Sequence, residues 1–439
     1  VDFAHRLEAR LPARLNGRLT LFPYATPEAV WNEHRESTRG RDLDITGLSW
    51  ATLERDGPQQ WPYPQGASSG KARLYADGIF PTADGRARFF AEAFKPVAEP
   101  CDARYPVALT TGRLRDQWHG MSRTGSVPRL FNHAPEPCID LHPSDLARRG
   151  LSDGELLRVA SRRGDIVLPA RATDTVRPGQ AFIAMHWGAE YLAGRNAEGV
   201  ARLGVNGLTL PVIDPYSFQP ELKHSAVRVE AANLTWHLAA FGWMPEASAQ
   251  ALRATLMQEL AELPFVMCVP FGRERTGLLL RTAARGAPAA DLLARIDAHF
   301  GLQGAAALHY ADPGRSVRRA MRLNGEMLDA ALLSGPAESV LAQGWLRELL
   351  QSEASAKPYG RWLLLPSTTP PANLPSPGHQ VCVCFDVWQS QIDALLPTLE
   401  GDADAQLATL QQKLKCGTNC GSCLPELRRM VRDCGRVSA

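Results

Sequence analysis

The sequence predicts a chain of mixed α/β class in which three kinds of segment follow one another. Short β-branched runs separated by turn residues fill residues 98–230, a pattern typical of a β barrel or sandwich. Ala- and Leu-rich stretches with helical periodicity then alternate with strand-like runs up to residue 375. Six of the nine cysteines lie in the last sixty residues, which indicates a small metal-binding domain at that end.

Individual elements follow from the same patterns. The runs Glu155–Ala160 and Ile166–Arg171 flank the turn residues Arg162–Asp165 and predict a hairpin. Helices are expected at 246–262, 289–300, 336–352 and 425–431, and strands at 278–281 and 317–323. The resulting four segments are 1–97, part of a larger domain; 98–235, the β domain; 236–375, an α+β spacer ending in the Pro-rich linker 366–377; and 376–439, the cysteine domain.

Composition limits the classes of partner. The 48 basic and 46 acidic residues nearly cancel, so no field of one sign favours nucleic acid or an anionic membrane surface. The sequence has neither a secretory signal pattern nor an apolar run of membrane-spanning length. Clustered rather than dispersed cysteines point to metal in a reducing compartment, so we expect a cytoplasmic protein. The start at Val1 reads as an amphipathic segment entered midway, and the chain is expected to be a fragment.

The cysteines form two short pairs. Cys382 and Cys384 are separated by one residue, Cys420 and Cys423 by two, and thirty-five residues lie between the pairs. Four thiolates of this kind can converge on one metal centre, and spacing alone leaves zinc and an iron–sulfur cluster both open. The other isolated cysteines, to which we assign no role, are Cys101, Cys138, Cys268 and Cys434.

The segments 381–385 and 415–426 resemble the [2Fe-2S] domain of the bacterioferritin-associated-ferredoxin type. The resemblance implies a small helical domain with Cys382, Cys384, Cys420 and Cys423 as cluster ligands, and it leaves Cys416 as a fifth thiol outside the pattern. The preceding stretch, 310–335, is similar to the segment before the same cluster domain in NADH-dependent nitrite reductases.

A second set of residues suits a phosphate-bearing ligand. The segment 107–113 reads as a strand that ends in Thr111-Gly112-Arg113, and exposed amides together with a guanidinium bind pyrophosphate oxygens well. Trp118 and His119 add a ring face and a directional hydrogen bond. Farther on, Asn206 stands between glycines in 204–209 and could read a purine-like edge. Taken alone, the Thr-Gly-Arg tripeptide and Asn206 are each better explained as ordinary turn residues.

Together and in this order, the pieces resemble the molybdopterin-guanine-dinucleotide-binding domain of the dimethyl-sulfoxide-reductase superfamily across residues 98–230. The resemblance implies a double-psi β-barrel. At Gln117 many relatives carry histidine, so the sequence departs from the pattern there. The implied cofactor contacts are Thr111, Gly112, Arg113, Trp118, His119, Asn206 and Lys223.

The segments 31–46, 57–62 and 77–82 resemble the bacterial assimilatory branch of nitrate reductases. This resemblance implies nitrate as substrate, a bis-molybdopterin-guanine-dinucleotide molybdenum cofactor, and electrons from a donor protein or an NADH-dependent reductase subunit. Catalytic residues stay unassigned, because none of the available arginines stands out as a nitrate ligand. Those arginines are Arg35, Arg39, Arg41, Arg86 and Arg88.

The cysteines that hold a [4Fe-4S] cluster and ligate molybdenum in this branch have no counterpart in the sequence. We therefore expect the [4Fe-4S] cluster in a missing N-terminal part and no nitrate reduction by the chain alone. Two alternatives stay open: part of another molybdopterin oxidoreductase such as a formate dehydrogenase, and a non-enzymatic interaction module stabilised by zinc.

Overall fold

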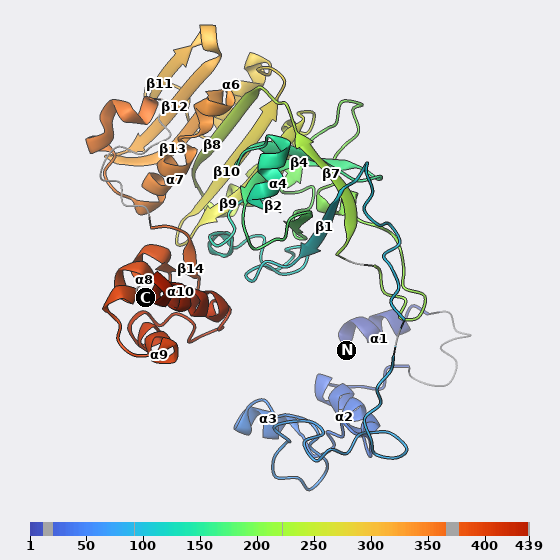
Figure 1. Cartoon of the computed structure of the whole chain (residues 1–439). Coiled ribbons are helices and arrows are strands. Elements are labelled where there is room, and N and C mark those ends of the chain that lie inside the picture. Colours follow the sequence, from blue (N-terminus) through green and yellow to red (C-terminus); the bar gives the residue numbers. More distant parts are fainter. Residues whose placement is uncertain (12–20, 92, 222, 366–376, 438–439) are drawn as a thin grey trace. The chain divides into compact units, whose positions relative to one another are not determined.

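The structure, a computed structural model, describes residues 1–11, 21–91, 93–221, 223–365 and 377–437 and divides into two compact units, 1–95 and 96–439. The first unit has a small core around Ile45, Leu48 and Tyr63. Thr26 and Ser49 cap helices in this unit by accepting backbone N–H bonds. Its helices are α1 (Asp2–Glu8), α2 (Pro27–Ser37) and α3 (Trp50–Asp56) (Figure 1).

Three of the arginines considered as nitrate ligands are engaged within this unit. Arg35 Nη1 donates to the Leu48 carbonyl at 2.5 Å. Arg39 pairs with Glu36, and Arg88 Nη2 lies 3.0 Å from Asp84 Oδ1. These contacts account for the three side chains as local structural elements, and none is assigned to substrate.

The second unit begins with a closed six-stranded barrel, which confirms the expected mixed α/β class and barrel. Its strand order is β1-β5-β2-β4-β3-β7, with β1/β5 and β2/β4 parallel and the other pairs antiparallel. The β3–β4 hairpin forms where the sequence predicts it. Alternating apolar residues such as Leu109, Ile139 and Ile183 are fully buried inside. The strands are β1 (Val107–Gly112), β2 (Ile139–Leu141), β3 (Leu156–Ala160), β4 (Asp165–Ala172), β5 (Gln180–Ala184) and β7 (Ser225–Ala231), with α4 (Pro143–Arg149) and 3-10 turns η1 (Pro128–Phe131) and η2 (Val205–Leu208) between them.

A seven-stranded antiparallel sheet follows in the order β11-β12-β13-β8-β10-β9-β6 (Figure 1). Residues of α5 and α6 share a core with one of its faces, while the other face shares a continuous core with α7 and the barrel. The sheet recruits β6 (Leu192–Ala193) from the barrel's part of the sequence. The remaining strands are β8 (Trp236–Met244), β9 (Phe265–Gly272), β10 (Thr276–Ala284), β11 (Ala307–Asp312), β12 (Val317–Asn324) and β13 (Met327–Gly335), and the helices are α5 (Glu246–Glu259), α6 (Ala290–His299) and α7 (Gln343–Ser352).

One expected helix is interrupted. In place of a continuous helix over 336–352, the chain forms a 3-10 turn η4 (Ala337–Val340) before α7. The Ser339 carbonyl accepts a 2.6 Å hydrogen bond from the fully buried Arg319, whose second nitrogen donates to the Leu365 carbonyl at 2.8 Å. The Arg319 guanidinium therefore binds a carbonyl within η4.

The cysteine domain is small and mainly helical. A core of leucines and valines around Leu410 and Leu427 also includes the thiols of Cys382, Cys416 and Cys423. Residues 366–376 of the expected linker lie outside the described residues. The elements are β14 (Gln380–Cys382), β15 (Val387–Trp388), α8 (Gln389–Leu395), η6 (Leu396–Thr398), α9 (Ala403–Leu414) and α10 (Leu424–Val437), after η3 (Pro313–Arg315) and η5 (Lys357–Leu364) earlier in the chain.

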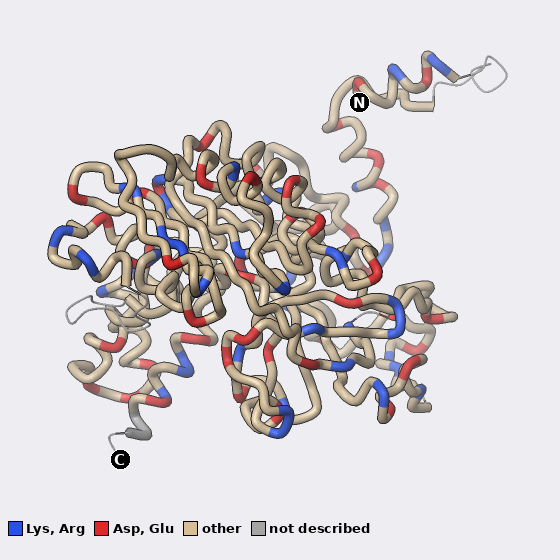
Figure 2. Tube along the Cα trace, turned by 90° about the horizontal axis from the view of Figure 1, so that it is seen from above, with Lys and Arg blue, Asp and Glu red and all other residues tan. Residues whose placement is uncertain are grey.

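Charge is distributed evenly along the chain. Lysines and arginines are interspersed with acidic residues along the trace and do not gather in long stretches of one sign (Figure 2). Among the helices of the described ranges, none combines the length and the apolar character that are needed to cross a bilayer.

Candidate dinucleotide and thiol sites

The parallel pairing of β1 and β5 builds one end of the barrel. Gly112 pairs with Ala184, so the loops that follow the two strands start side by side. The Met185 amide donates to the Gly112 carbonyl at 2.8 Å and extends this pairing by one step. Thr111 and Gly112 are half-buried at the strand end, and Arg113 is exposed beyond them. The sequence predicts a turn at Thr111-Gly112-Arg113, but β1 continues through Gly112 because that residue still pairs with β5, and the three residues lie at one end of the barrel.

His186, which sequence reasoning missed, fixes the loop that begins at Arg113. The Leu114 amide donates to His186 Nε2 at 2.9 Å, and His186 Nδ1 donates to the His119 carbonyl. Both ring nitrogens are therefore used, and burial lowers the pKa of His186, so the neutral ring is favoured. The sequence signal was a histidine two residues after the buried strand β5. Its contact with Leu114 could not be predicted, because it depends on the pairing of β1 with β5.

The exposed face of this loop carries the predicted polar and aromatic groups. Arg113 Nη2 lies 3.2 Å from His119 Nε2, and the His119 ring meets the Trp118 ring edge-on at a centroid distance of 4.6 Å. The Arg123 guanidinium lies over Trp118, 5.4 Å from its centroid. His119 has a φ of 27° in the left-handed region, which turns the chain back toward the barrel. The result is a surface of donors next to an aromatic ring.

Asn206 and Lys223 reach the same end of the barrel by different routes. Gly204 precedes η2 with a φ of 68°, and a Cβ there would lie 2.4 Å from the Trp187 carbonyl, so only glycine allows this approach. The Val205 amide donates to that carbonyl at 3.0 Å, which ties η2 to the segment after β5. Asn206 is exposed on η2. Lys223 is also exposed. It lies two residues before Ser225 of β7, and Ser225 pairs with Leu109 of β1.

Gln117, the position that departs from the family pattern, is turned inward. Its side chain is buried and its Nε2 donates to the Leu130 carbonyl at 3.0 Å. Within the described part of the chain, its Oε1 accepts no hydrogen bond. Gln117 thus supports the loop from beneath, while Trp118 and His119 face outward.

The predicted metal ligands lie in two pairs. Cys384 Sγ is 3.4 Å from Cys420 Sγ, and Cys423 is in hydrogen-bond contact with Cys382. Across the described residues, no three Cys, His, Asp or Glu side chains are grouped closely enough to hold one metal ion. The fifth thiol, Cys416, is fully buried and faces the Leu410 carbonyl at 3.8 Å. The structure therefore gives two thiol pairs and a separate buried cysteine.

The thiols differ in their ease of ionisation. Hydrogen bonds from Ser422 lower the pKa of the Cys420 thiol. Burial raises the pKa of Cys423 to about 12 and that of Cys416 to about 11. A thiolate is the species that binds metal, so the Cys420 thiol is more readily available as a ligand than the Cys423 thiol, which would need the metal's charge to ionise.

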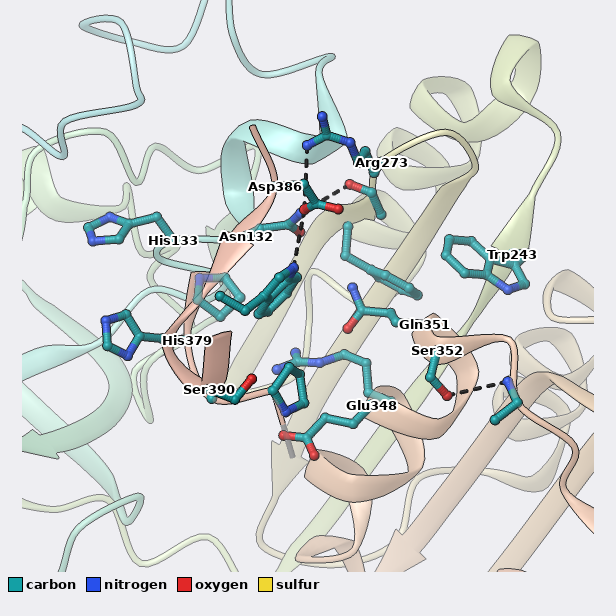
Figure 3. A pocket seen from close by; sticks show the side chains of 18 of the residues that line it. Asn132, His133, Trp243, Arg273, Glu348, Gln351, Ser352, His379, Asp386 and Ser390 are labelled. Carbon is teal, nitrogen blue, oxygen red and sulfur yellow. Dashed lines mark hydrogen bonds and ion pairs between the residues drawn. The ribbon is translucent and has the colours of Figure 1, made fainter. Parts of the chain in front are cut away.

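A cavity of about 710 Å³ lies where the cysteine domain meets the sheet and the barrel. Figure 3 shows His133 and His379 at one end and Trp243 at the other. Asp386 accepts from Trp388 Nε1 at 3.2 Å and lies 3.5 Å from Arg273 Nη1, so these charges are mutually engaged. We call this region, where the barrel, the sheet and the cysteine domain meet around the cavity, the seam.

Comparison with known proteins gives this fold a class. Residues 107–226 match the family described as the Molydopterin dinucleotide binding domain. The match runs from the start of β1 to the first residues of β7 and includes both loops described above. Residues 107–226, which include the open end of the barrel, are thus similar to a molybdopterin dinucleotide-binding domain.

Similarity to individual curated proteins extends beyond this domain. The chain is 31% identical over 424 residues to a nitrate reductase of Klebsiella oxytoca, covering 93% of the chain and 44% of that protein. It is 37% identical over 212 residues to a nitrate reductase of Synechocystis, covering 47% and 29%. An F420-dependent formate dehydrogenase subunit alpha of Methanocaldococcus jannaschii is 32% identical over 209 residues, covering 48% and 28%. The chain is similar to nitrate reductases over most of its length, and it spans less than half of the first of these relatives.

Proposed function

We propose that the chain is a portion of an assimilatory nitrate reductase that binds a molybdopterin guanine dinucleotide and relays electrons through a [2Fe-2S] cluster. The observation that carries the proposal is the gathering of the dinucleotide candidates at one end of a barrel that belongs to the dinucleotide-binding family. Similarity to a nitrate reductase across 93% of the chain supports the choice of substrate. Two parallel strand pairs support a barrel of the double-psi type.

The chain's own residues suit the parts of a guanine dinucleotide. The strand end at Thr111 and Gly112 and the cations of Arg113 and Lys223 would hold the phosphates. Asn206 would read the purine edge, and Trp118 with His119 would border the ring system. When bound, the molybdenum cofactor supplies the oxygen-atom transfer chemistry that converts nitrate to nitrite. The barrel positions the cofactor and excludes water at its buried side.

The two thiol pairs suit a cluster of two irons, with Cys382, Cys384, Cys420 and Cys423 as its four ligands. Zinc prefers four ligands around one ion, whereas a two-iron cluster divides its thiolates between two metals. The 3.4 Å separation of Cys384 and Cys420 and the contact of Cys382 with Cys423 support this division. In the complete enzyme we propose that electrons come from a donor protein or NADH-dependent reductase subunit, and that a [4Fe-4S] cluster is also present.

A formate dehydrogenase portion is the second candidate. The formate dehydrogenase subunit of Methanocaldococcus jannaschii matches about half of the chain at a similar identity. The 93% coverage by a nitrate reductase favours the first candidate. Reduction of nitrate and failure to oxidise formate by the full enzyme would separate the two.

The thiol site is tested by anaerobic reconstitution of the chain with iron and sulfide. We expect visible absorption and about two irons per chain, both lost in Cys420→Ser. Cys101→Ser, which changes an exposed cysteine outside the pairs, is the matched control and should keep the cluster. A colourless chain that binds one zinc through the same cysteines would overturn the cluster and favour the interaction module.

The dinucleotide site is tested with guanosine diphosphate as the probe. Arg113→Ala and Lys223→Ala should each weaken binding about tenfold, because each removes a charged partner of phosphate. Arg148→Ala, which changes an arginine on α4, is the control and should leave binding unchanged. Equal binding by all three variants would exclude this end of the barrel as the phosphate site.

A further inference from the structure

Arg115, in the loop that follows β1, contacts the segments next to both cysteine pairs of the cysteine domain. Arg115 stands between Arg113 and the Trp118–His119 pair. Its Nη2 donates to the Val381 carbonyl at 2.6 Å, one residue before Cys382. Its Nη1 donates to Glu426 Oε2 at 2.8 Å, three residues after Cys423. One guanidinium thus joins two segments that are 45 residues apart in the cysteine domain.

The contact is buried and charged. The side chains of Arg115 and Glu426 are only 16% and 14% exposed. Asp116 Oδ2 lies 3.1 Å from Arg115 Nε, so the guanidinium has partners on three nitrogens. Fork-shaped donation to a carboxylate and a carbonyl is a geometry that lysine cannot reproduce. Removal of one partner would leave a poorly solvated charge, so the contact resists separation.

Two histidines complete the network around Glu426. His379 Nε2 lies 2.5 Å from Glu426 Oε1, and His133 Nε2 is 4.0 Å from Glu426 Oε2. His379 precedes the first cysteine pair, whereas His133 belongs to the barrel. Both line the cavity at the seam, where Figure 3 shows them on the same side. Barrel and cysteine domain therefore share one carboxylate.

We propose that Arg115 is a positioning residue that docks the cysteine domain on the dinucleotide loop and so keeps the thiol pairs and the 113–119 loop at one separation. The docking itself is independent of any bound group. Its use in electron transfer rests on the proposed function, because it gives the cluster a fixed place beside the dinucleotide. The loop then has two faces, with Arg113 and His119 toward the ligand and Arg115 toward the thiols.

The docking is tested on the full metal-free chain by hydrogen exchange. Arg115→Met should accelerate exchange of the amides at 380–384 by about tenfold, because charged hydrogen bonds across the seam are lost. Arg123→Met is the matched control: it changes an arginine over Trp118 in the same loop and should leave 380–384 unchanged. The amides of β1 and β5 report whether each variant keeps the barrel.

Swapping the charges of Arg115 and Glu426 makes the test specific to this ion pair. Arg115→Glu and Glu426→Arg should each accelerate exchange at 380–384, and the double variant should recover part of the loss. Unchanged exchange at 380–384 in Arg115→Met, with β1 and β5 intact, would overturn the docking. A double variant no better than the two single variants would also overturn the Arg115–Glu426 pairing.

The reconstituted chain gives a second readout that packing alone would not move. A cation near Cys423 stabilises the more negative, reduced cluster, so Arg115→Met should lower the cluster's midpoint potential and Arg115→Lys should largely retain it. Equal potentials in all three proteins would overturn a positioning role toward the cluster. A chain that takes up no iron would contradict the proposed cluster, while the exchange measurements would still decide the docking.

Discussion

The two candidate sites of the second unit are held together by different kinds of interaction. At the dinucleotide end, backbone pairing between β1 and β5 and the two hydrogen bonds of His186 hold the loop in place. In the cysteine domain, the candidate ligands are thiols that contact one another in pairs. The first arrangement is complete without a ligand, whereas buried neutral thiols gain their strongest partner only when metal binds. The dinucleotide end should therefore be preorganised, and the cysteine domain should depend on its metal.

The largest expected effect tests this contrast directly. Loading the chain with iron and sulfide should stabilise the cysteine domain by several kcal/mol, because metal binding to thiolates adds to the free energy of folding. Hydrogen exchange at α9 and α10 should slow strongly on loading, while the barrel strands change little. The Cys384→Ser variant is expected to lose the difference between loaded and metal-free samples. Equal slowing in barrel and cysteine domain would break the comparison.

Removal of His186 should have the next largest effect, at the other site. His186→Ala leaves the Leu114 amide and the His119 carbonyl without their partner, and the loss of these two part-buried hydrogen bonds should cost about 1–2 kcal/mol. Chemical denaturation should show this loss, and guanosine diphosphate binding should weaken because Arg113 and His119 lose their support. His142→Ala, at the cap of α4, controls for loss of a histidine. Normal nucleotide binding by a folded His186→Ala variant would contradict preorganisation.

The fifth thiol sharpens the comparison within the cysteine domain. Cys416 is buried against the Leu410 carbonyl and lies outside the two pairs. Cys416→Ala should lower stability by about 1 kcal/mol through lost packing and leave two irons per chain. Cys423→Ala should instead abolish iron binding. Iron lost from Cys416→Ala, with the metal-free fold intact, would make Cys416 a ligand in place of a neighbour.

How much of this could be predicted from sequence depended on the distance between interacting residues. Thr111-Gly112-Arg113 and the β3–β4 hairpin are local patterns, and the cysteine pairs can be recognised from their spacing in the sequence. His186 acts on Leu114 only because two strands pair in parallel. Arg115 and Glu426 are 311 residues apart, and nothing local distinguishes either side chain. Likewise β6 joins the sheet through partners on β9 that its two residues do not reveal.

The smallest expected effect lies at the seam between the two sites. The hydrogen bond to Glu426 is the main cause that raises the pKa of His379 above its ordinary value, and nearby Arg115 opposes the shift. A raised pKa means that protonated His379 favours the docked state. This contribution is complete below about pH 6.5, the unfolded value, and is lost as pH rises through the folded value.

Docking should therefore weaken slightly as pH rises above about 6.5, by less than about 1 kcal/mol, because His379 is partly exposed and its charge is screened. Burial is the main cause that lowers the pKa of His133, so its contribution is lost as pH falls below 6.5 and lies outside this window. Exchange at 380–384, corrected for the intrinsic pH dependence of amide exchange, measures the change. His379→Gln should remove the slope while it keeps a hydrogen bond to Glu426, and a slope that persists in this variant would assign the effect to another group.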